Sequence, residues 1–304
     1  MDLWQLHIFC RVVETRSFSK AAERVRLSQP TVSSHIKDLE DHFGCPLIDR
    51  LSRQALPTQA GELLYGYALR LLALRDEIEA VMARYQGKSL GRLTVGGSTI
   101  PGGYLLPQIV GRFQKRHPGV TLALVVADTG EIIRRVLEGT LELGVVGAAP
   151  RNRQLVHEML LADRLQLVVP RNHPWASRRE VPFSLLQQEP FILREEGSGT
   201  RQAIEEALRR AGRGIGDLRV VAEMGSTEAV RQAIREGVGV SILSELAVRE
   251  DLAAGRLAAL RVAGLALRRH FHLIHHRQRQ PGPLAVEFTA FLKESLASRH
   301  ADGP

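Results

Sequence analysis

The stretch SQPTVSSHIK, residues 28–37, places polar and mostly short side chains along one side of a predicted helix. Val32, Ile36 and Leu39 recur at helical spacing and predict one buried stripe. The other side carries Ser, Thr, Gln and His, which can donate and accept hydrogen bonds at base edges if the helix enters the major groove of DNA. The residues of this helix predicted to contact DNA are Ser28, Gln29, Pro30, Thr31, Ser33, Ser34, His35 and Lys37.

A tight joint centred on Arg26-Leu27-Ser28 separates this helix from a preceding helix that Ser17 can cap. Pro30 fits a first helical turn, where its missing N–H has no intrahelical partner. The spacing alone equally allows an ordinary solvated helix, but the tight joint favours a helix-turn-helix. The following residues, 44–58, predict a loop or short hairpin, in which Arg50 and Arg53 are suited to gripping backbone phosphates.

A second set of polar residues follows predicted strands beyond residue 90. Gly-Ser-Thr triplets at 97–99 and 225–227 each end a strand and open a helix, and Gly197-Ser198-Gly199-Thr200 opens another. Helix N-termini have unpaired N–H groups, so several of them converging on one cleft would bind a small anion or carboxylate. Each hydroxyl alone is better explained as a helix cap, and only the repetition favours a ligand site. The candidates are Ser98, Thr99, Thr129, Thr200, Ser226 and Thr227.

Residues 58–85 predict one long helix, capped by Thr58 and followed by a hinge at Gln86-Gly87-Lys88-Ser89. Its apolar residues alternate at spacings of three and four, as in a heptad seam. The alternative is a core helix inside one domain, but so narrow a stripe flanked by charges fits a two-helix dimer contact better. The predicted seam consists of Leu64, Tyr67, Leu71, Leu74, Ile78 and Val81.

Beyond residue 90, six short apolar runs rich in β-branched residues alternate with helical stretches such as 131–138 and 200–211. This alternation predicts an α/β sheet covered by helices. About 210 residues can form one such domain or two similar lobes, and the recurring Gly-Ser-Thr triplet favours two lobes.

Charge and composition narrow the function classes. The chain of 304 residues has a formal net charge of +8, which makes a polyanion or an anionic ligand plausible. Residues 1–60 nevertheless contain eight Lys or Arg and seven Asp or Glu residues, so charge alone does not identify a nucleic-acid module there. No run of 18 apolar residues predicts a membrane span, and the start lacks the features of a signal peptide, which favours a cytoplasmic location.

Catalytic and metal sites are not expected. GSGTR at 197–201 lacks the Lys-Ser/Thr of a phosphate-binding loop, and neither GxSxG nor HExxH occurs. Glu195-Glu196 and Glu205-Glu206 are interpreted as solvated charge. Cys10 and Cys45 are interpreted as buried reduced thiols, and His270 and His272 as one face of a strand in which they alternate with Phe271 and Leu273. We expect no metal and no cofactor.

With these residues in place, nearly the whole chain resembles a LysR-type transcriptional regulator. The specific part is the order and spacing of N-terminal residues, which are Phe18, Ala21-Ala22, Leu27-Ser28-Gln29-Pro30, Val32-Ser33, Ile36, Leu39-Glu40, Gly44, Leu47, Arg50, Thr58 and Ala60-Gly61. Ile48 and Pro57 depart from the family pattern, where Phe and Leu are usual, and neither departure threatens the fold. The segments GGSTIPGGYLLP and REEGSGTR resemble the branch with regulators of sulfur assimilation and carbon fixation.

The resemblance implies a multidomain chain. It comprises an all-α winged helix-turn-helix at 1–58, a linker and dimerisation helix with hinge at 59–89, and a two-lobed α/β effector domain at 90–304 like periplasmic binding proteins. Lobe I would span about 90–161 and 267–304, and lobe II about 162–266. The hydroxyl residues named above would contact the effector, and Ser34 and His35 would tune which bases are read.

The implied partners are double-stranded DNA, a small effector, RNA polymerase and further copies of the chain, arranged as a homotetramer, or dimer of dimers. The basic excess beyond residue 90 favours an anionic effector. Two other classes of protein fit the sequence less well. A solute-binding transport component would share the two lobes, but the helical head and the missing signal peptide of this chain argue against it. An anion-processing enzyme would need a set of catalytic residues, and none can be argued from this sequence.

Overall fold

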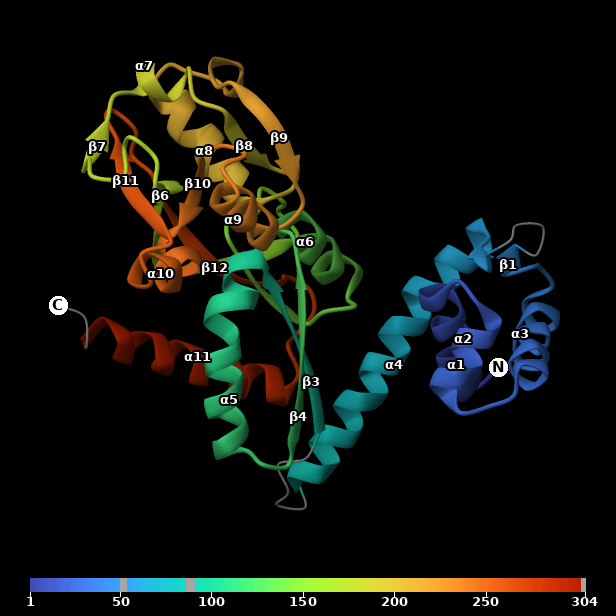
Figure 1. Cartoon of the computed structure of the whole chain (residues 1–304). Coiled ribbons are helices and arrows are strands. Elements are labelled where there is room, and N and C mark those ends of the chain that lie inside the picture. Colours follow the sequence, from blue (N-terminus) through green and yellow to red (C-terminus); the bar gives the residue numbers. More distant parts are fainter. Residues whose placement is uncertain (50–53, 86–90, 302–304) are drawn as a thin grey trace. The chain divides into compact units, whose positions relative to one another are not determined.

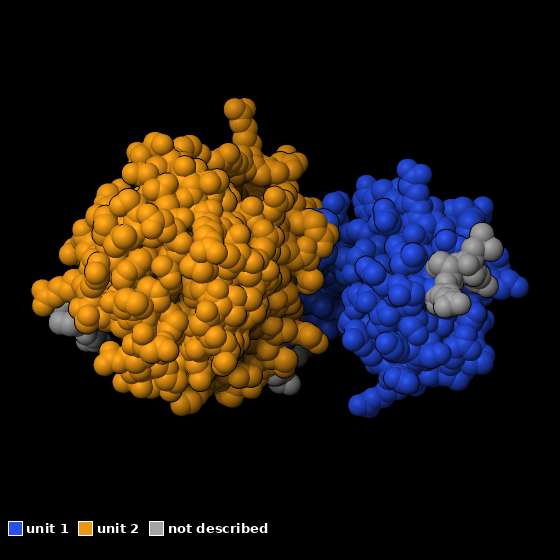
Figure 2. All heavy atoms as spheres, turned by 45° about the horizontal axis from the view of Figure 1, so that its top comes forward, with its two compact units in different colours: residues 1–91, 138–140 blue, residues 92–137, 141–304 orange. Residues whose placement is uncertain are grey.

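The computed structural model describes residues 1–49, 54–85 and 91–301, and the chain forms two compact units (Figure 2). One unit consists of residues 1–91 with 138–140, and the other of residues 92–137 with 141–304. Within the described ranges, every helix is too short or too polar to cross a lipid bilayer.

The first unit is a helical head followed by one long helix (Figure 1). Its elements are α1 (Leu3–Thr15), α2 (Phe18–Val25), α3 (Gln29–Phe43), β1 (Ile48–Asp49), β2 (Leu56–Pro57) and α4 (Gln59–Tyr85). Ser17, Ser28 and Thr58 accept hydrogen bonds from the N–H groups of Lys20, Thr31 and Gly61, so all three predicted caps are confirmed. Arg26 ends α2 in the left-handed backbone region, with φ of 56°, which confirms the tight joint before α3. Arg16 ends α1 in the same region, with φ of 51°.

The core of the head is built from α1, α2 and α3 around the predicted stripe. Val32, Ile36 and Leu39 are fully buried there, which confirms the stripe. The antiparallel pair β1–β2 confirms the hairpin alternative for residues 44–58, and Ile48 lies directly opposite Pro57 in it. The two departures from the family pattern therefore meet at one cross-strand contact.

Two contacts fix the hairpin against the helices. The Glu40 carboxylate on α3 accepts hydrogen bonds from the N–H groups of Leu47 and Ile48, at 2.9 and 3.2 Å. Gly61 on α4 passes so close to the hairpin that an added Cβ would lie 2.1 Å from the carbonyl oxygen of Leu47. Only glycine permits this approach, which explains why the chain has Gly directly after Ala60.

The second unit is an α/β structure, as predicted. Its strands are β3 (Gly91–Ser98), β4 (Val120–Ala127), β5 (Leu143–Val146), β6 (Leu155–Pro170), β7 (Glu180–Val181), β8 (Phe191–Arg194), β9 (Val220–Met224), β10 (Ser241–Ser244), β11 (Leu257–Val262) and β12 (Arg268–His276). Its helices are η1 (Pro101–Leu105), α5 (Leu106–Arg116), α6 (Thr129–Glu138), α7 (Phe183–Leu186), α8 (Gly199–Arg210), η2 (Ile215–Asp217), α9 (Thr227–Arg235), α10 (Glu245–Ala253) and α11 (Pro283–Ala301). All six predicted strands are present, whereas β7, β8, β10 and β11 were not predicted.

Two long strands, β6 and β12, connect two lobes of this unit (Figure 1). β6 pairs with β12 from Leu155 to Arg164, and with β10 and β11 from Leu165 to Pro170. We call lobe I the part built on β3, β4 and β5, and lobe II the part built on β8 to β11. Residues at the ends of β3 in lobe I and β8 in lobe II come into contact beside these two strands, as Arg194 and Thr99 show.

Separate apolar cores hold the lobes together internally. In lobe I, Ile132 and Val136 on α6 pack against Val146 and Ile274. In lobe II, one core forms around Leu167, Phe191 and Ile242, and a second forms around residues such as Val168, Ile192 and Val230. Leu167 and Val168 are neighbours on β6 but belong to different cores, because both faces of the lobe II sheet are covered.

The histidines of β12 and the two cysteines lie among the described residues. Phe271 and Leu273 are buried and His270 is exposed, which confirms the alternation along β12. Burial, together with electrostatic repulsion from His157 and His270, lowers the pKa of His272 to about 4. No group of metal-ligating side chains occurs within the described ranges. Cys10 is buried, and burial raises the pKa of its thiol to about 12, while Cys45 is only half-buried.

Candidate DNA-reading helix and effector site

The polar side of α3 is open at the surface of the first unit. Ten residues were predicted to contact DNA, and six of the eight in this helix are exposed, namely Ser28, Gln29, Pro30, Thr31, Ser34 and Lys37. Ser33 and His35 are half-buried, and Nδ1 of His35 is buried without a hydrogen-bond partner in the described structure. Arg50 and Arg53, predicted to grip phosphates, lie outside the described residues. These exposed residues are the N-cap and residues within the first nine positions of α3.

The predicted heptad seam of α4 is an exposed apolar stripe in the single chain. Tyr67, Leu71, Leu74 and Ile78 are between 41% and 57% exposed, and Leu64 is half-buried. A different face of α4, with Ala68 and Leu72, packs into the head. Leu64 also packs against the head core, whereas the four exposed residues of the stripe lie outside that core, unlike in the alternative of a core helix. The side chain of Val81 and the predicted hinge at 86–89 lie outside what the structure describes.

Five of the six predicted effector residues come together where the lobes meet. Ser98, Thr99 and Thr129 belong to lobe I, and Thr200 and Thr227 belong to lobe II. Two buried arginines and their acidic partners lie among them. We call this group the interlobe cluster; it consists of Ser98, Thr99, Thr129, Asp163, Arg194, Glu195, Thr200, Thr227 and Arg269.

Arg194, at the end of β8, links hydroxyls of both lobes although it is only 1% exposed. Its Nη1 donates to Thr227 Oγ1 at 2.6 Å, and its Nη2 donates to Thr99 Oγ1 at 3.3 Å. Nε and Nη2 donate to the two carboxylate oxygens of Glu195, each at 2.6 Å. The guanidinium is thus held by one carboxylate and by one hydroxyl from each lobe.

Arg269, at the start of β12, is the second buried cation. Its Nε donates to Asp163 Oδ2 on β6 at 2.8 Å, and its Nη1 donates to Thr200 Oγ1 at 3.1 Å. Its Nη2 is buried and has no partner in the described structure. Burial lowers the pKa of this guanidinium, the carboxylate of Asp163 opposes the effect, and the charge of Arg194 adds to it.

Two glycines allow the lobes to approach closely at the cluster. A Cβ on Gly199, which begins α8, would lie 2.7 Å from Thr129 Oγ1 and 3.0 Å from the backbone of Gly147. A Cβ on Gly147 would lie 2.9 Å from Arg269 Nη1 and 3.6 Å from Ser98 Oγ. The hydroxyl of Thr129 is buried and unpartnered within the described residues. The cluster therefore holds two polar groups, Thr129 Oγ1 and Arg269 Nη2, whose hydrogen bonds are not made.

Several of these Ser side chains serve as helix caps, which is the explanation that the sequence favours for each hydroxyl taken alone. Ser198 accepts from the N–H groups of Thr200 and Arg201 at the start of α8. Ser226 is half-buried and accepts from the N–H of Ala229 at the start of α9, at 3.1 Å. Ser226 is thus the one predicted effector residue that the structure leaves outside the cluster.

The charged residues of the cluster were not predicted. The interpretation of Glu195 as a solvated charge is wrong, because its side chain is paired with Arg194 and only 21% exposed. The same interpretation of Glu196 is confirmed, because its side chain is 90% exposed. A signal existed for both arginines. Arg269 has the same strand phase as the buried Phe271 and Leu273, and Arg194 ends the apolar run Phe191-Ile192-Leu193.

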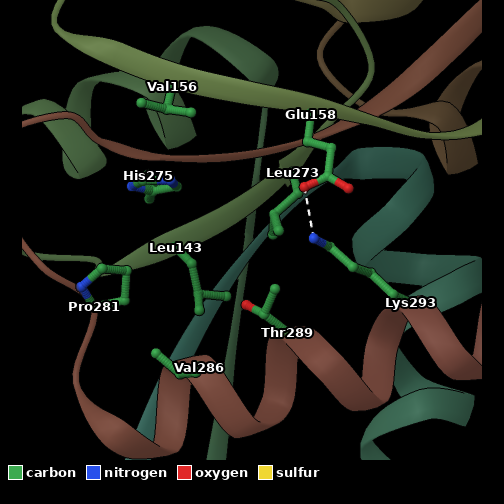
Figure 3. A pocket seen from close by; sticks show the side chains of 9 residues that line it. All are labelled: Leu143, Val156, Glu158, Leu273, His275, Pro281, Val286, Thr289 and Lys293. Atoms are coloured by element: carbon green, nitrogen blue, oxygen red, sulfur yellow. Dashed lines mark ion pairs between the residues drawn. The ribbon is translucent and has the colours of Figure 1, made fainter.

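A small cavity of about 160 Å³ lies elsewhere, between the lobe I sheet and α11 (Figure 3). Apolar side chains such as Leu143, Leu273 and Val286 line most of it, and Lys293 at its rim forms an ion pair with Glu158 at 2.6 Å. None of the predicted effector residues lines this cavity, so it is distinct from the interlobe cluster.

Comparison with known proteins assigns both units. Residues 3–62 match the family model described as bacterial regulatory helix-turn-helix protein, lysR family, and residues 86–297 match the LysR substrate binding domain. The RuBisCO operon transcriptional regulator of Allochromatium vinosum is 34% identical over 301 residues, which cover 99% of this chain and 98% of that protein.

Solved structures agree with this assignment. The regulatory domain of CcmR from Synechocystis PCC6803, solved in complex with 2-PG, is 29% identical, with a TM-score of 0.62 over 67% of this chain and 97% of that one. Full-length CbnR complexed with its target DNA is 23% identical and supports the fold, with a TM-score of 0.71 over 97% and 100% of the two chains. The chain therefore belongs to the LysR family, and it is a DNA-binding transcriptional regulator with an effector-binding domain.

Proposed function

We propose that this regulator responds to a small anion, bearing a phosphate or carboxylate group, that binds at the interlobe cluster. The observation that carries the proposal is the pair of unmade hydrogen bonds at Thr129 Oγ1 and Arg269 Nη2. A buried polar group without a partner costs about 1–3 kcal/mol, so a ligand oxygen that accepts from these donors recovers that free energy. The neighbouring guanidinium of Arg194 adds a second cation that suits an anion.

A relative supports the chemical class. CcmR, whose regulatory domain was solved with 2-PG (2-phosphoglycolate), binds a small molecule that carries both a phosphate and a carboxylate. Two arginines within one cluster match two anionic groups, since a guanidinium pairs with either group through parallel hydrogen bonds. We therefore place this chain's effector in the class of small phosphorylated or dicarboxylic acids. The absence of a further cofactor remains a prediction.

The effector proposal is tested by titrating the full-length protein with 2-phosphoglycolate and inorganic phosphate in a calorimeter. We expect saturable binding, and the Thr129→Val variant is expected to bind about tenfold more weakly because it lacks one hydroxyl donor. The same variant should unfold at an unchanged or slightly higher temperature, since its hydroxyl makes no hydrogen bond in the described structure.

Ser226→Ala is the matched control for this experiment. It removes a cap and should lower the stability of α9 by about 1 kcal/mol, while leaving anion affinity unchanged. Anion affinity that falls equally in both variants, or that is undetectable in the unmodified protein, would contradict an effector site at the cluster.

For DNA, we propose that α3 enters the major groove with its N-terminal polar surface, and that residues of the hairpin contact phosphates. The exposure of Ser34 and Lys37 on one side of α3, opposite Val32 and Ile36, supports this orientation. The helix N-terminus at Ser28 is suited to a backbone phosphate.

Two single variants separate base reading from phosphate binding. Ser34→Ala is expected to weaken binding to a selected operator by about 1–3 kcal/mol and to leave binding to scrambled DNA unchanged. Lys37→Ala should weaken both by similar factors and reduce the slope of log K against log salt by about one. Fluorescence anisotropy at several salt concentrations measures both effects. Equal losses on both DNAs for Ser34→Ala would show that this residue reads no base.

We further propose that the exposed stripe of α4 pairs with the same stripe of a second copy, giving a dimer that assembles into a homotetramer. The division into head at 1–58, linker at 59–89 and effector domain at 90–304 belongs to the same proposal. Contact with RNA polymerase follows only from the class of protein and remains a prediction.

A further inference from the structure

The contact between Arg194 and Glu195 has the form of a ligand complex. Nε and Nη2 of the guanidinium each donate to a different oxygen of one carboxylate, both at 2.6 Å. This two-point arrangement is how arginine recognises carboxylate and phosphate groups of ligands. Glu195 thus places an anion on the edge of Arg194 that is best suited to receive one.

Two of the three remaining N–H groups of Arg194 donate to hydroxyls of the protein. Thr227 Oγ1 accepts from Nη1, and Thr99 Oγ1 accepts from Nη2. Arg194 is also anchored through its backbone, because its carbonyl oxygen accepts from Nη1 of Arg201 at 3.1 Å. The guanidinium is therefore held in one position, whether its two-point partner is Glu195 or another anion.

Glu195 itself is less firmly held. Its side chain is 21% exposed, whereas that of Arg194 is 1% exposed, so the solvent reaches the pair from the glutamate side. An incoming anion can approach along this side, and the displaced carboxylate can turn into water. The neighbouring Glu196, which is 90% exposed, already occupies such a solvated position.

We infer that the carboxylate of Glu195 is a built-in competitor of the effector, occupying on Arg194 the place that an anionic group of the effector takes. This inference rests on the proposed anion site. In the effector-free protein, Glu195 provides the charged partner that the buried guanidinium of Arg194 needs. The free energy needed to displace the Glu195 carboxylate sets the effector concentration at which the site fills. Because the effector must outcompete a carboxylate, a doubly charged phosphate is favoured over a single carboxylate.

The test measures affinity for inorganic phosphate in the full-length protein by calorimetry, comparing Glu195→Gln, Glu195→Asp and Glu196→Gln. Glu195→Gln keeps the size of the side chain and removes its charge, so we expect phosphate to bind about tenfold tighter or more. Glu195→Asp keeps the charge but is too short for the same two-point contact, and should also tighten binding. Glu196→Gln makes the same charge change on a solvated side chain and should leave the affinity within about a factor of two.

Each outcome decides the inference. Tighter binding in Glu195→Gln alone, with Glu195→Asp like the unmodified protein, would mean that only background charge matters, and would overturn direct competition. Unchanged affinity in both Glu195 variants would overturn the inference while leaving the anion site intact. No binding of phosphate in any of the proteins would overturn the proposed anion site as well. Thermal unfolding without phosphate checks that each variant folds, and added phosphate should raise the melting temperature of Glu195→Gln more than that of Glu196→Gln.

Discussion

The double variant Leu71→Glu/Leu74→Glu is expected to be monomeric and to bind operator DNA at least about 100-fold more weakly than the unmodified protein. Both leucines lie on the exposed apolar stripe of α4, at 41% and 50% exposure. If two stripes pack as a coiled coil, the new carboxylates are buried without partners and the pairing fails. A monomer brings only one α3 to the DNA and loses the effective concentration of the second. Sedimentation velocity measures the assembly state, and anisotropy measures the affinity.

Ala73→Glu is the control for the double variant, because Ala73 is exposed on the same helix but lies off the seam. It adds one carboxylate, where the double variant adds two, and should leave both assembly and affinity unchanged. A double variant that sediments as the unmodified protein does would refute the seam, and the exposed stripe would need another partner.

Asp163→Leu is expected to lower the free energy of unfolding by about 3–5 kcal/mol. The substitution leaves the guanidinium of Arg269 buried without its carboxylate, which lies 2.8 Å away where β6 and β12 cross between the lobes. Asp163 is 3% exposed and Arg269 is 7% exposed, so water cannot replace the lost partner. Each kcal/mol corresponds to about 2–4 °C in a domain of this size, and thermal unfolding followed by circular dichroism measures the change.

Two further variants show whether the charge pair is responsible. Asp163→Leu/Arg269→Met removes both charges and should recover most of the lost stability, because an apolar pair of similar volume needs no counter-ion. Ser244→Ala removes the hydroxyl that donates to Asp163 Oδ1 at 2.7 Å and that caps α10 by accepting from the N–H of Leu246, and should cost about 1–2 kcal/mol. If the double variant is as unstable as the single one, the loss comes from packing and not from a stranded charge.

Local features of the head could be predicted from the sequence. The caps at Ser17, Ser28 and Thr58 and the buried stripe of α3 depend on residues within a few positions of one another, so their spacing determines them. The exposed stripe of α4 was predicted for the same reason. The strands β8, β10 and β11 were missed, because short apolar runs buried on both faces lack the alternation that identifies a strand.

The interlobe cluster shows the limit of such prediction. The hydroxyls at 98–99, 129, 200 and 227 were found because strand ends that open helices recur along the chain. Arg269 was overlooked because its partner Asp163 is 106 residues away and the two meet only when β6 pairs with β12. Glu195 and Glu196 are identical neighbours in the sequence, yet only one of them faces a buried arginine.

The sequence by itself therefore determined the class of protein, the side of α3 that is buried and the positions of the helix starts in the head, since these follow from composition, spacing and a family motif. Only the tertiary structure decided which hydroxyls lie together, which one merely caps a helix, and which charges are withdrawn from water. The physical reason is that the crossing of β6 and β12 brings distant residues into contact, and that burial, not residue type, decides whether a charge needs a partner.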